Sequence, residues 1–197
     1  MIAQSGYPLI GINGFKGAGK DTVAGHLARM YGFTHYAFAD KLKQAVANLF
    51  GITVDQVNEF KEIMKDDLPK GEVHLQIMNE TTWAFDWREF LQRFGTEMGR
   101  NTFGSEFWVN LLMSKPFYGP VVISDVRFQN EMIAIKNQGG KIVRIERPGC
   151  EAEEHVSERE PDFKLVDYTI KNDLDKIHLF LEVEKMLTEL YGIELHA

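Results

Sequence analysis

Short apolar runs along the chain alternate with stretches in which apolar residues recur every three or four positions. The runs predict buried strands, and the wider spacing predicts amphipathic helices. The predicted strands lie at 9–12, 33–39, 121–124, 141–146 and 168–170. The predicted helices lie at 20–31, 41–50, 130–138 and 174–191. This alternation indicates an α/β fold, in which a mostly parallel five-stranded sheet lies between two layers of helices, α/β/α.

Residues 52–115 interrupt the alternation. Thr53 and Gln56 have the spacing of a capping box at the start of a helix. The predicted elements of this stretch are a hairpin at 72–85 and three helices, at 54–64, 87–99 and 105–113. We therefore expect residues 1–197 to form a single domain with a small helical and hairpin insert at 52–115.

For two helices, the spacing of apolar residues alone predicts which face is buried. In the helix at 41–50, which Asp40 is expected to cap, the inward face carries Leu42, Val46, Leu49 and Phe50. In the last helix, the apolar face carries Ile177, Leu181, Val183, Leu187 and Leu190. We therefore expect the side chains of both sets to be buried.

The helix predicted at 87–99 has two contrasting faces at about 100° per residue. Its apolar face carries Trp87, Phe90, Leu91, Phe94 and Met98. Its opposite face carries Arg88, Gln92, Gly95, Thr96 and Gly99. A glycine inside a helix costs about 1 kcal/mol relative to alanine. Two glycines beside polar residues therefore indicate a close approach, either by a ligand or by another helix.

The most specific chemical pattern is a glycine-rich turn after the first strand. The spacing Gly14-x4-Gly19-Lys20 is that of a P-loop, in which backbone N–H groups surround phosphates and the lysine reaches the β- and γ-phosphates. The residues expected to bind the nucleotide are Gly14, Lys16, Gly17, Ala18, Gly19, Lys20, Asp21 and Thr22. The alternative is a strand-to-helix turn without a ligand. The strand before it and the helix after it favour the P-loop.

One position departs from the usual P-loop pattern. The residue after Lys20 is usually Ser or Thr, whose hydroxyl binds Mg²⁺. Here it is Asp21, and Thr22 follows one position later. How the two side chains share the metal is left open.

A second candidate group follows the apolar run VVIS at 121–124. Asp125 comes at the end of this run, and Arg127 and Glu131 come shortly after it. Ligands of open α/β sheets bind beyond the carboxyl ends of the strands, so these side chains are expected beside the P-loop. An acidic residue there can hold Mg²⁺ directly or through water. The alternative is a structural ion-pair cluster.

Composition narrows the function classes. The formal net charge of -7 argues against a protein that coats nucleic acid, which would need a basic face. Cys150 is the single cysteine, which fits a reducing compartment and argues against a zinc cluster. The sequence has no long apolar run or signal-like segment, so we expect a cytoplasmic protein without a membrane span. The acidic stretch at 148–164 is interpreted either as a lid loop or as a solvated loop.

Five segments in order resemble the deoxynucleoside monophosphate kinases of tailed bacteriophages. They are GFKGAGKDT, FADKLK, REFLQRFGTE, SDVRFQNE and HVSE. The resemblance runs from about residue 9 to residue 172 and implies a P-loop NTPase fold. An aspartate after the P-loop lysine is usual in that family, so Asp21 agrees with it.

The resemblance implies roles for individual residues. Gly17, Gly19, Lys20, Asp21 and Thr22 would hold the ATP phosphates and Mg²⁺, with Asp21, Thr22 and Asp125 nearest the metal. The acceptor nucleotide would be bound by Arg88, Gln92, Gly95, Thr96, Trp108, Asp125, Arg127 and Glu131. The catalytic residues would be Lys20, Arg88, Asp125 and Arg127. Trp108 fits a place in the core as well as one beside the acceptor base or sugar.

The implied activity is Mg²⁺-dependent transfer of the ATP γ-phosphoryl group to a deoxynucleoside 5′-monophosphate, which supplies DNA precursors. The implied partner is this small molecule and not a nucleic-acid polymer or a membrane. If the chain is phage-encoded, the compartment is the host cytoplasm. The accepted bases, the deoxy or ribo preference, and the choice between monomer and homodimer are left open. The alternatives are a P-loop kinase for another small acceptor and a nucleotide-binding switch or NTPase module.

Overall fold

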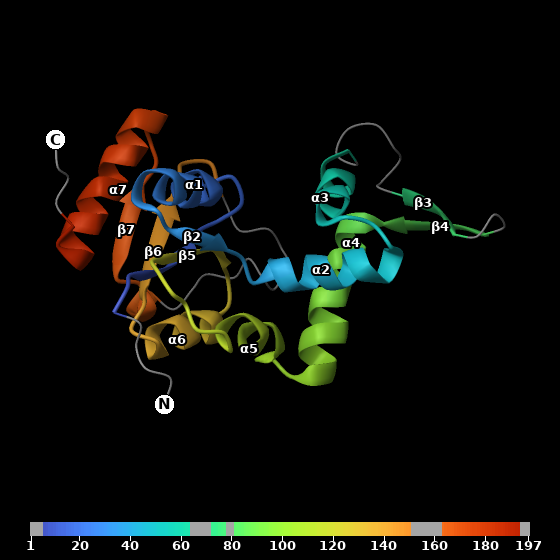
Figure 1. The fold of residues 1–197 in the computed structure, drawn as a ribbon. Helices are drawn as coiled ribbons and strands as arrows, with labels where there is room; N and C mark the ends of the chain where they lie inside the picture. Colours follow the sequence, from blue (N-terminus) through green and yellow to red (C-terminus); the bar gives the residue numbers. More distant parts are fainter. Residues whose placement is uncertain (1–5, 64–71, 78–80, 151–162, 194–197) are drawn as a thin grey trace. The chain divides into compact units, whose positions relative to one another are not determined.

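The computed structural model describes residues 6–63, 72–77, 81–150 and 163–193 (Figure 1). The chain divides into two compact units, each considered separately below. The first unit is Met1–Phe38 with Met113–Ala197, and the second is Ala39–Leu112. The predicted insert at 52–115 overlaps the second unit, which begins earlier because the helix at Ala39–Phe50 packs with the helices that follow it.

The first unit is built on a five-stranded sheet. The elements of this unit are β1 (Leu9–Asn13), α1 (Lys20–Tyr31), β2 (Thr34–Tyr36), β5 (Val121–Val126), α6 (Gln129–Asn137), β6 (Lys141–Glu146), a 3₁₀ turn (Phe163–Leu165), β7 (Tyr168–Lys171) and α7 (Lys176–Tyr191). The strand order is β2-β5-β1-β6-β7, and every pairing is parallel. The predicted α/β/α fold with a mostly parallel sheet is confirmed. The second strand is shorter than the predicted 33–39.

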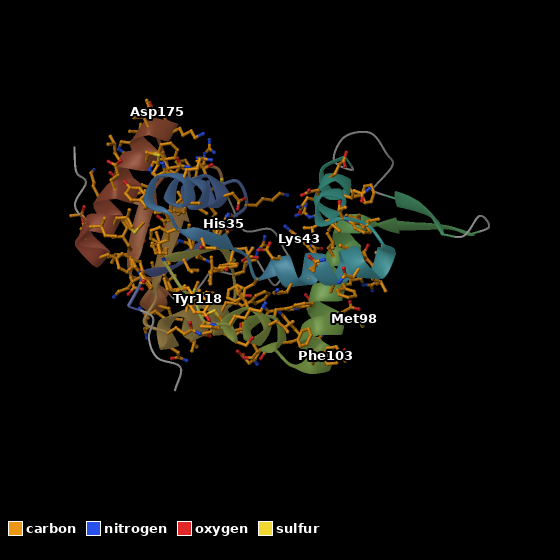
Figure 2. All side chains as sticks on the ribbon, in the orientation of Figure 1. His35, Lys43, Met98, Phe103, Tyr118 and Asp175 are labelled. Atoms are coloured by element: carbon orange, nitrogen blue, oxygen red, sulfur yellow. The ribbon has the colours of Figure 1, made fainter. Side chains whose placement is uncertain are left out.

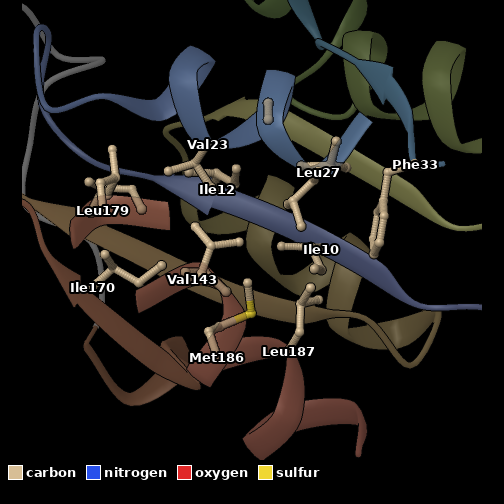
Figure 3. Close-up of a cluster of buried hydrophobic side chains, with 14 of the residues drawn as sticks. Ile10, Ile12, Val23, Leu27, Phe33, Val143, Ile170, Leu179, Met186 and Leu187 are labelled. Atoms are coloured by element: carbon tan, nitrogen blue, oxygen red, sulfur yellow. The ribbon is translucent and has the colours of Figure 1, made fainter. Parts of the chain in front are cut away.

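Alternation along β1 assigns a helix layer to each face of the sheet. Ile10 and Ile12 are fully buried in one core cluster with residues of α1 and α7 (Figure 3). Gly11, between them, faces the other way, since a Cβ there would lie 2.6 Å from Cδ1 of Ile135 on α6. The centre of the sheet is therefore covered on both faces, which suits an all-parallel sheet.

The helix ends follow local sequence signals. Gly32 closes α1 in the left-handed conformation, at φ 68°, as predicted for the C′ residue. The Asp175 side chain caps α7 by accepting a hydrogen bond from the backbone N–H of His178 (Figure 2). The helix at Ala39–Phe50 starts one residue before Asp40, so Asp40 lies in its first turn instead of capping it.

The second unit combines helices with a hairpin. Its elements are α2 (Ala39–Phe50), α3 (Val54–Ile63), β3 (Glu72–Ile77), β4 (Thr81–Asp86), α4 (Trp87–Arg93), a π-helix η1 (Phe94–Asn101) and α5 (Phe107–Met113), the last of which ends at the first unit. The predicted hairpin is confirmed as an antiparallel pair, β3 with β4. The Thr53–Gln56 capping box is also confirmed, with hydrogen bonds in both directions. Trp87 is fully buried in the core of this unit, and its indole N–H donates to the Val57 carbonyl at 3.0 Å.

Three apolar side chains that were expected to be buried are exposed. Leu49 is 63% exposed, Ile177 71% and Leu181 49%. The buried residues of α7 are Leu179, Val183, Met186 and Leu187. Val183 and Leu187 are buried as predicted, whereas Ile177 and Leu181 lie outside the stripe of α7 that packs into the core cluster with α1 and β7. Within the described residues, no helix is long and apolar enough to cross a membrane.

Candidate active site

The glycine-rich loop lies where three parallel strands end together. It follows β1, the central strand, whose neighbours are β5 and β6. In the register of the sheet, Asn13 at the end of β1 pairs with Val126 on one side and with Arg144 on the other. The loop thus lies at the carboxyl edge of the sheet. Strands that come later in the chain lie on both sides of β1 here, with β5 on one side and β6 on the other. This is the position at which open α/β sheets bind ligands.

The loop has the backbone of a phosphate cradle. Gly14 has φ 151°, and a Cβ there would meet the Ile145 carbonyl at 2.6 Å, so a side chain is excluded. The α1 helix begins at Lys20, so its N-terminal end faces the loop. The Lys20 ammonium donates to the carbonyls of Gly14 and Phe15, at 2.7 and 2.8 Å. These features fit a polyphosphate, because the helix dipole and the ammonium concentrate positive charge at the loop.

Side chains from two other strands hold the outer side of this loop. Asn172, immediately after β7, donates through Nδ2 to the Ala18 carbonyl at 2.8 Å. Arg147, immediately after β6, donates to the Gly17 carbonyl at 3.2 Å. Two carbonyls of the loop therefore have side-chain partners that come from the ends of neighbouring strands.

A buried arginine supports the start of the loop. Arg144 on β6 is 4% exposed and donates through Nη1 to Oδ1 of Asn13 at 3.1 Å. Asn13 in turn donates to the Val126 carbonyl at 2.9 Å, which ties β1 to β5. The Arg144 guanidinium also lies 5.2 Å from the centre of the Phe15 ring and donates to Glu146 at 3.0 Å. The Arg144–Glu146 ion pair therefore lies next to the start of the loop, in contact with Asn13 and Phe15.

Asp125, the predicted acidic helper, lies within β5 and next to the end of β1. Its Oδ1 accepts a hydrogen bond from the backbone N–H of Phe38 at 2.7 Å. The first unit thus brings this carboxylate to the same sheet edge as the loop. The structure places Lys16 and Asp21 at the surface and leaves Thr22 half-buried at the start of α1.

Arg127 and Glu131 are joined through the backbone. Glu131 is 2% exposed, and its Oε2 accepts hydrogen bonds from the backbone N–H groups of Arg127 and Phe128, at 2.7 and 3.0 Å. The carboxylate thereby satisfies two backbone N–H groups at the start of α6, whose N-cap residue is Phe128. The Arg127 residue is exposed, directly after β5. This geometry gives Glu131 a positioning role for the Arg127 backbone.

The other predicted acceptor residues lie in the second unit. Arg88 is exposed on α4, Gln92 is half-buried on α4, and Thr96 is half-buried on η1. The prediction of one α-helix over 87–99 is wrong in its second half, because residues 94–101 form a π-helix with i→i+5 hydrogen bonds. The wider turn shifts the faces that a regular α-helix would present. Met98, expected on the apolar face, is 52% exposed (Figure 2).

The glycines of this helix are explained by a side chain of the protein. A Cβ on Gly99 would lie 2.6 Å from Cε2 of Trp108, and a Cβ on Gly95 would lie 2.8 Å from Cδ1 of Leu42. The Trp108 indole N–H also donates to the Gly95 carbonyl at 2.8 Å, and Trp108 is 6% exposed. The close approach at this helix is therefore packing, and the glycines do not by themselves indicate a ligand.

The donor set around the loop is suited to magnesium. In the described part of the chain, no three His, Cys, Asp or Glu residues gather into a metal-binding group. Mg²⁺ in kinases keeps several waters and binds one or two carboxylates together with the substrate phosphates. Asp21, Thr22 and Asp125 carry side-chain oxygens, the donor type that Mg²⁺ prefers. The lid predicted at 148–164 falls largely on residues outside the described ranges.

Sequence reasoning missed the residues that support the loop. Asn13, Arg144 and Asn172 are all buried polar side chains at the carboxyl ends of strands. A signal was available, since each follows or ends an apolar run whose carboxyl end reaches the same edge of a parallel sheet. Which residues these side chains contact depends on the order of the strands in the sheet, and this order could not be predicted from the sequence.

Comparisons with known proteins show which family the chain belongs to. A family model described as deoxynucleotide monophosphate kinase matches residues 56–180. The chain belongs to the deoxynucleotide monophosphate kinase family. A protein of Acanthamoeba polyphaga mimivirus, provisionally named as such a kinase, is 37% identical over 157 residues, which are 77% of this chain and 81% of the relative. The deoxynucleotide monophosphate kinase of Enterobacteria phage T4 is 23% identical over 239 aligned positions, which cover 92% of this chain and 99% of the relative.

The fold is also found in a solved structure of low sequence identity. The Thermus thermophilus protein TT1252 superimposes with a TM-score of 0.52 at 18% identity. The superposition covers 95% of this chain and 100% of the Thermus chain. A shikimate kinase from Aquifex aeolicus has a TM-score of 0.44 at 16% identity, over 93% of this chain and 96% of the other. The family model and the mimivirus relative confirm the predicted family, and with it a phosphotransferase that acts on a small nucleotide.

Proposed function

We propose that the protein transfers the γ-phosphoryl group of ATP to a deoxynucleoside 5′-monophosphate, which yields the diphosphate and ADP. The observation that supports this most strongly is the glycine loop with Lys20 at the carboxyl edge of the sheet, with Asp125 at the same edge, in a chain of this family. Phosphoryl transfer requires little covalent chemistry from the protein. It requires positioned reactants and neutralised charge, which these groups can provide.

The donor side is assigned to the first unit. The loop from Gly14 to Gly19 binds the ATP phosphates through backbone N–H groups, and Lys20 exchanges its present carbonyl partners for the β- and γ-phosphates. A bound Mg²⁺ would neutralise phosphate charge during transfer. Asp21, Thr22 and Asp125 are the residues that we propose to hold it. Lys16 and Ala18 complete the set proposed for the donor nucleotide.

The residues proposed for the acceptor nucleotide are charged and polar, and those of each unit are considered separately. We propose that Arg127 binds a phosphate group at the edge of the sheet while Glu131 fixes its backbone. In the second unit, Arg88, Gln92 and Thr96 are proposed to bind the acceptor nucleotide. Gly95 and Trp108 are proposed to contribute indirectly, because the indole N–H holds the Gly95 carbonyl and shapes the helix that carries Thr96.

An ADP-release assay with each deoxy- and ribonucleoside monophosphate tests the proposal. We expect ATP consumption to accelerate strongly with at least one deoxynucleoside monophosphate and only in the presence of Mg²⁺. If another small phosphate or alcohol is the acceptor, no nucleoside monophosphate accelerates the reaction. If the protein is a nucleotide switch, slow hydrolysis proceeds without any acceptor. Either result would overturn the proposal.

Variants of the two phosphate-directed cations test the residue roles. Lys20→Ala and Arg127→Ala are each expected to lower turnover by roughly 10³-fold, since phosphate-directed cations have effects of that order. Lys171→Ala, an exposed lysine at the end of β7, is the matched control and should retain wild-type turnover. Near-wild-type turnover in either active-site variant would contradict its assigned role.

A further inference from the structure

The loop between β1 and α1 needs its peptide planes held in one orientation. A phosphate cradle works only if the N–H groups point into it, so the carbonyls of the same peptides must point outward and find other partners. The peptide between Ala18 and Gly19 is trans, as are all described peptides. In a trans peptide the C=O and the N–H point in opposite directions. Whatever binds the Ala18 carbonyl therefore also determines where the Gly19 N–H points.

The partner of the Ala18 carbonyl is Asn172. Its Nδ2 donates to this carbonyl at 2.8 Å, and the asparagine is 8% exposed. A hydrogen bond that is shielded from water is costly to break without a substitute, so the peptide is not free to rotate. Gly19 has φ 105°, and a Cβ there would lie 2.8 Å from Nδ2 of Asn172. A side chain at position 19 would therefore both strain the backbone and collide with Asn172.

The position of Asn172 is set by the sheet and not by its side chain. Its backbone N–H donates to the Glu146 carbonyl at 2.7 Å, which continues the pairing of β6 with β7 by one residue. Any residue at 172 could make this backbone hydrogen bond. The amide side chain is therefore available for one task, which is to connect the edge of the sheet to the loop.

We propose that Asn172 is a positioning residue for phosphoryl transfer, which holds the Ala18–Gly19 peptide so that the Gly19 N–H points into the phosphate cradle. The inference rests on the proposed function only in assigning this loop to the phosphates of ATP. It predicts that the contribution of Asn172 is directed at the polyphosphate and is independent of the base of the nucleotide.

The test compares ATP with inorganic tripolyphosphate, which has the phosphates but no base or sugar. Asn172→Leu preserves most of the side-chain volume and removes the donor, and Asn172→Ala removes both. We expect each variant to bind Mg²⁺-tripolyphosphate and Mg²⁺-ATP about 10-fold more weakly by calorimetry, with the same factor for both ligands. The KM for ATP should rise, and the KM for the monophosphate should stay unchanged. Asp173→Ala, the exposed neighbour, is the control and should bind both ligands like the wild type.

Three results would overturn the inference. Unchanged tripolyphosphate affinity combined with weaker ATP binding would make Asn172 a contact to the base or sugar. Unchanged affinity for both ligands would leave it without a role in binding. Unfolding of both variants in circular dichroism would assign it to the stability of the sheet. These binding measurements need no acceptor, so they remain distinct from the ADP-release assay, whose failure would reject the proposed reaction alone.

Discussion

Glu131 offers a direct test of whether a predicted substrate residue acts through structure. Its carboxylate is almost fully buried and accepts two backbone hydrogen bonds, from Arg127 and Phe128. Hydrogen bonds to charged groups contribute about 1.5–3 kcal/mol each. Both bonds share one oxygen, so their energies do not add fully. We expect Glu131→Ala to lower the free energy of unfolding by about 3 kcal/mol, which corresponds to about 6–12 °C in Tm for a chain of this size.

Glu131→Gln is the matched control. The amide oxygen of glutamine can accept the same two hydrogen bonds without the charge, so the expected loss is about 1 kcal/mol. If Glu131 acts by fixing the Arg127 backbone, Glu131→Gln should also retain most of the turnover. Urea unfolding followed by circular dichroism at pH 7 gives the stabilities, and the ADP-release assay gives the turnover.

Two results would refute this reasoning. A Glu131→Ala variant within 0.5 kcal/mol of the wild type, about the scatter of surface substitutions, would show that the carboxylate does not support α6. A Glu131→Gln variant of normal stability that has lost about 100-fold or more in turnover would instead place the charge at the substrate.

Further predictions concern packing, pH and the acidic helper. Gly99→Ala should destabilise the protein by about 1–3 kcal/mol in urea unfolding, because its methyl group overlaps the Trp108 indole, and Trp108→Leu should partly rescue it. Burial lowers the pKa of His26, so as the pH falls through 6.5 the unfolded chain binds a proton at this side chain before the folded protein does. The free energy of unfolding of the wild type should therefore decrease as the pH falls through 6.5. A His26→Phe variant whose free energy of unfolding depends on pH in the same way would contradict this. In Asp125→Asn, the amide oxygen can still accept the hydrogen bond from the Phe38 N–H, so the Tm should stay unchanged. Turnover should fall by roughly 100-fold. Normal turnover would exclude Asp125 as a residue that holds the metal.

Local signals predicted the elements of this chain well. The P-loop spacing, Gly32 after α1, the Thr53–Gln56 capping box and the hairpin within 72–85 are all read from residues that interact over a few positions. Interactions over a few positions depend on the local backbone conformation and on neighbouring side chains, and both can be predicted from a short stretch of sequence. Family resemblance added the reaction class, which the comparisons confirm.

Predictions failed where a partner from elsewhere in the chain decided the outcome. Apolar spacing placed Ile177 and Leu181 on one face of α7 with Val183 and Leu187. Only Val183 and Leu187 are buried, because packing into the core cluster decides which positions are covered. The glycine face at Gly95 and Gly99 correctly indicated a close approach. The approaching group was Trp108, a residue nine positions beyond Gly99 in sequence, together with Leu42 at Gly95, and the π-helix that accommodates it has no local signal.

The sequence by itself determined that a glycine loop, a lysine and an acidic residue follow apolar strands of an α/β protein. Only the tertiary structure decided how that loop is held. Asn172 is 154 positions from Ala18 and Arg144 is 131 positions from Asn13, and each pair meets because parallel strands end at one edge. Strand order results from packing over the whole sheet, and no short stretch of sequence specifies it.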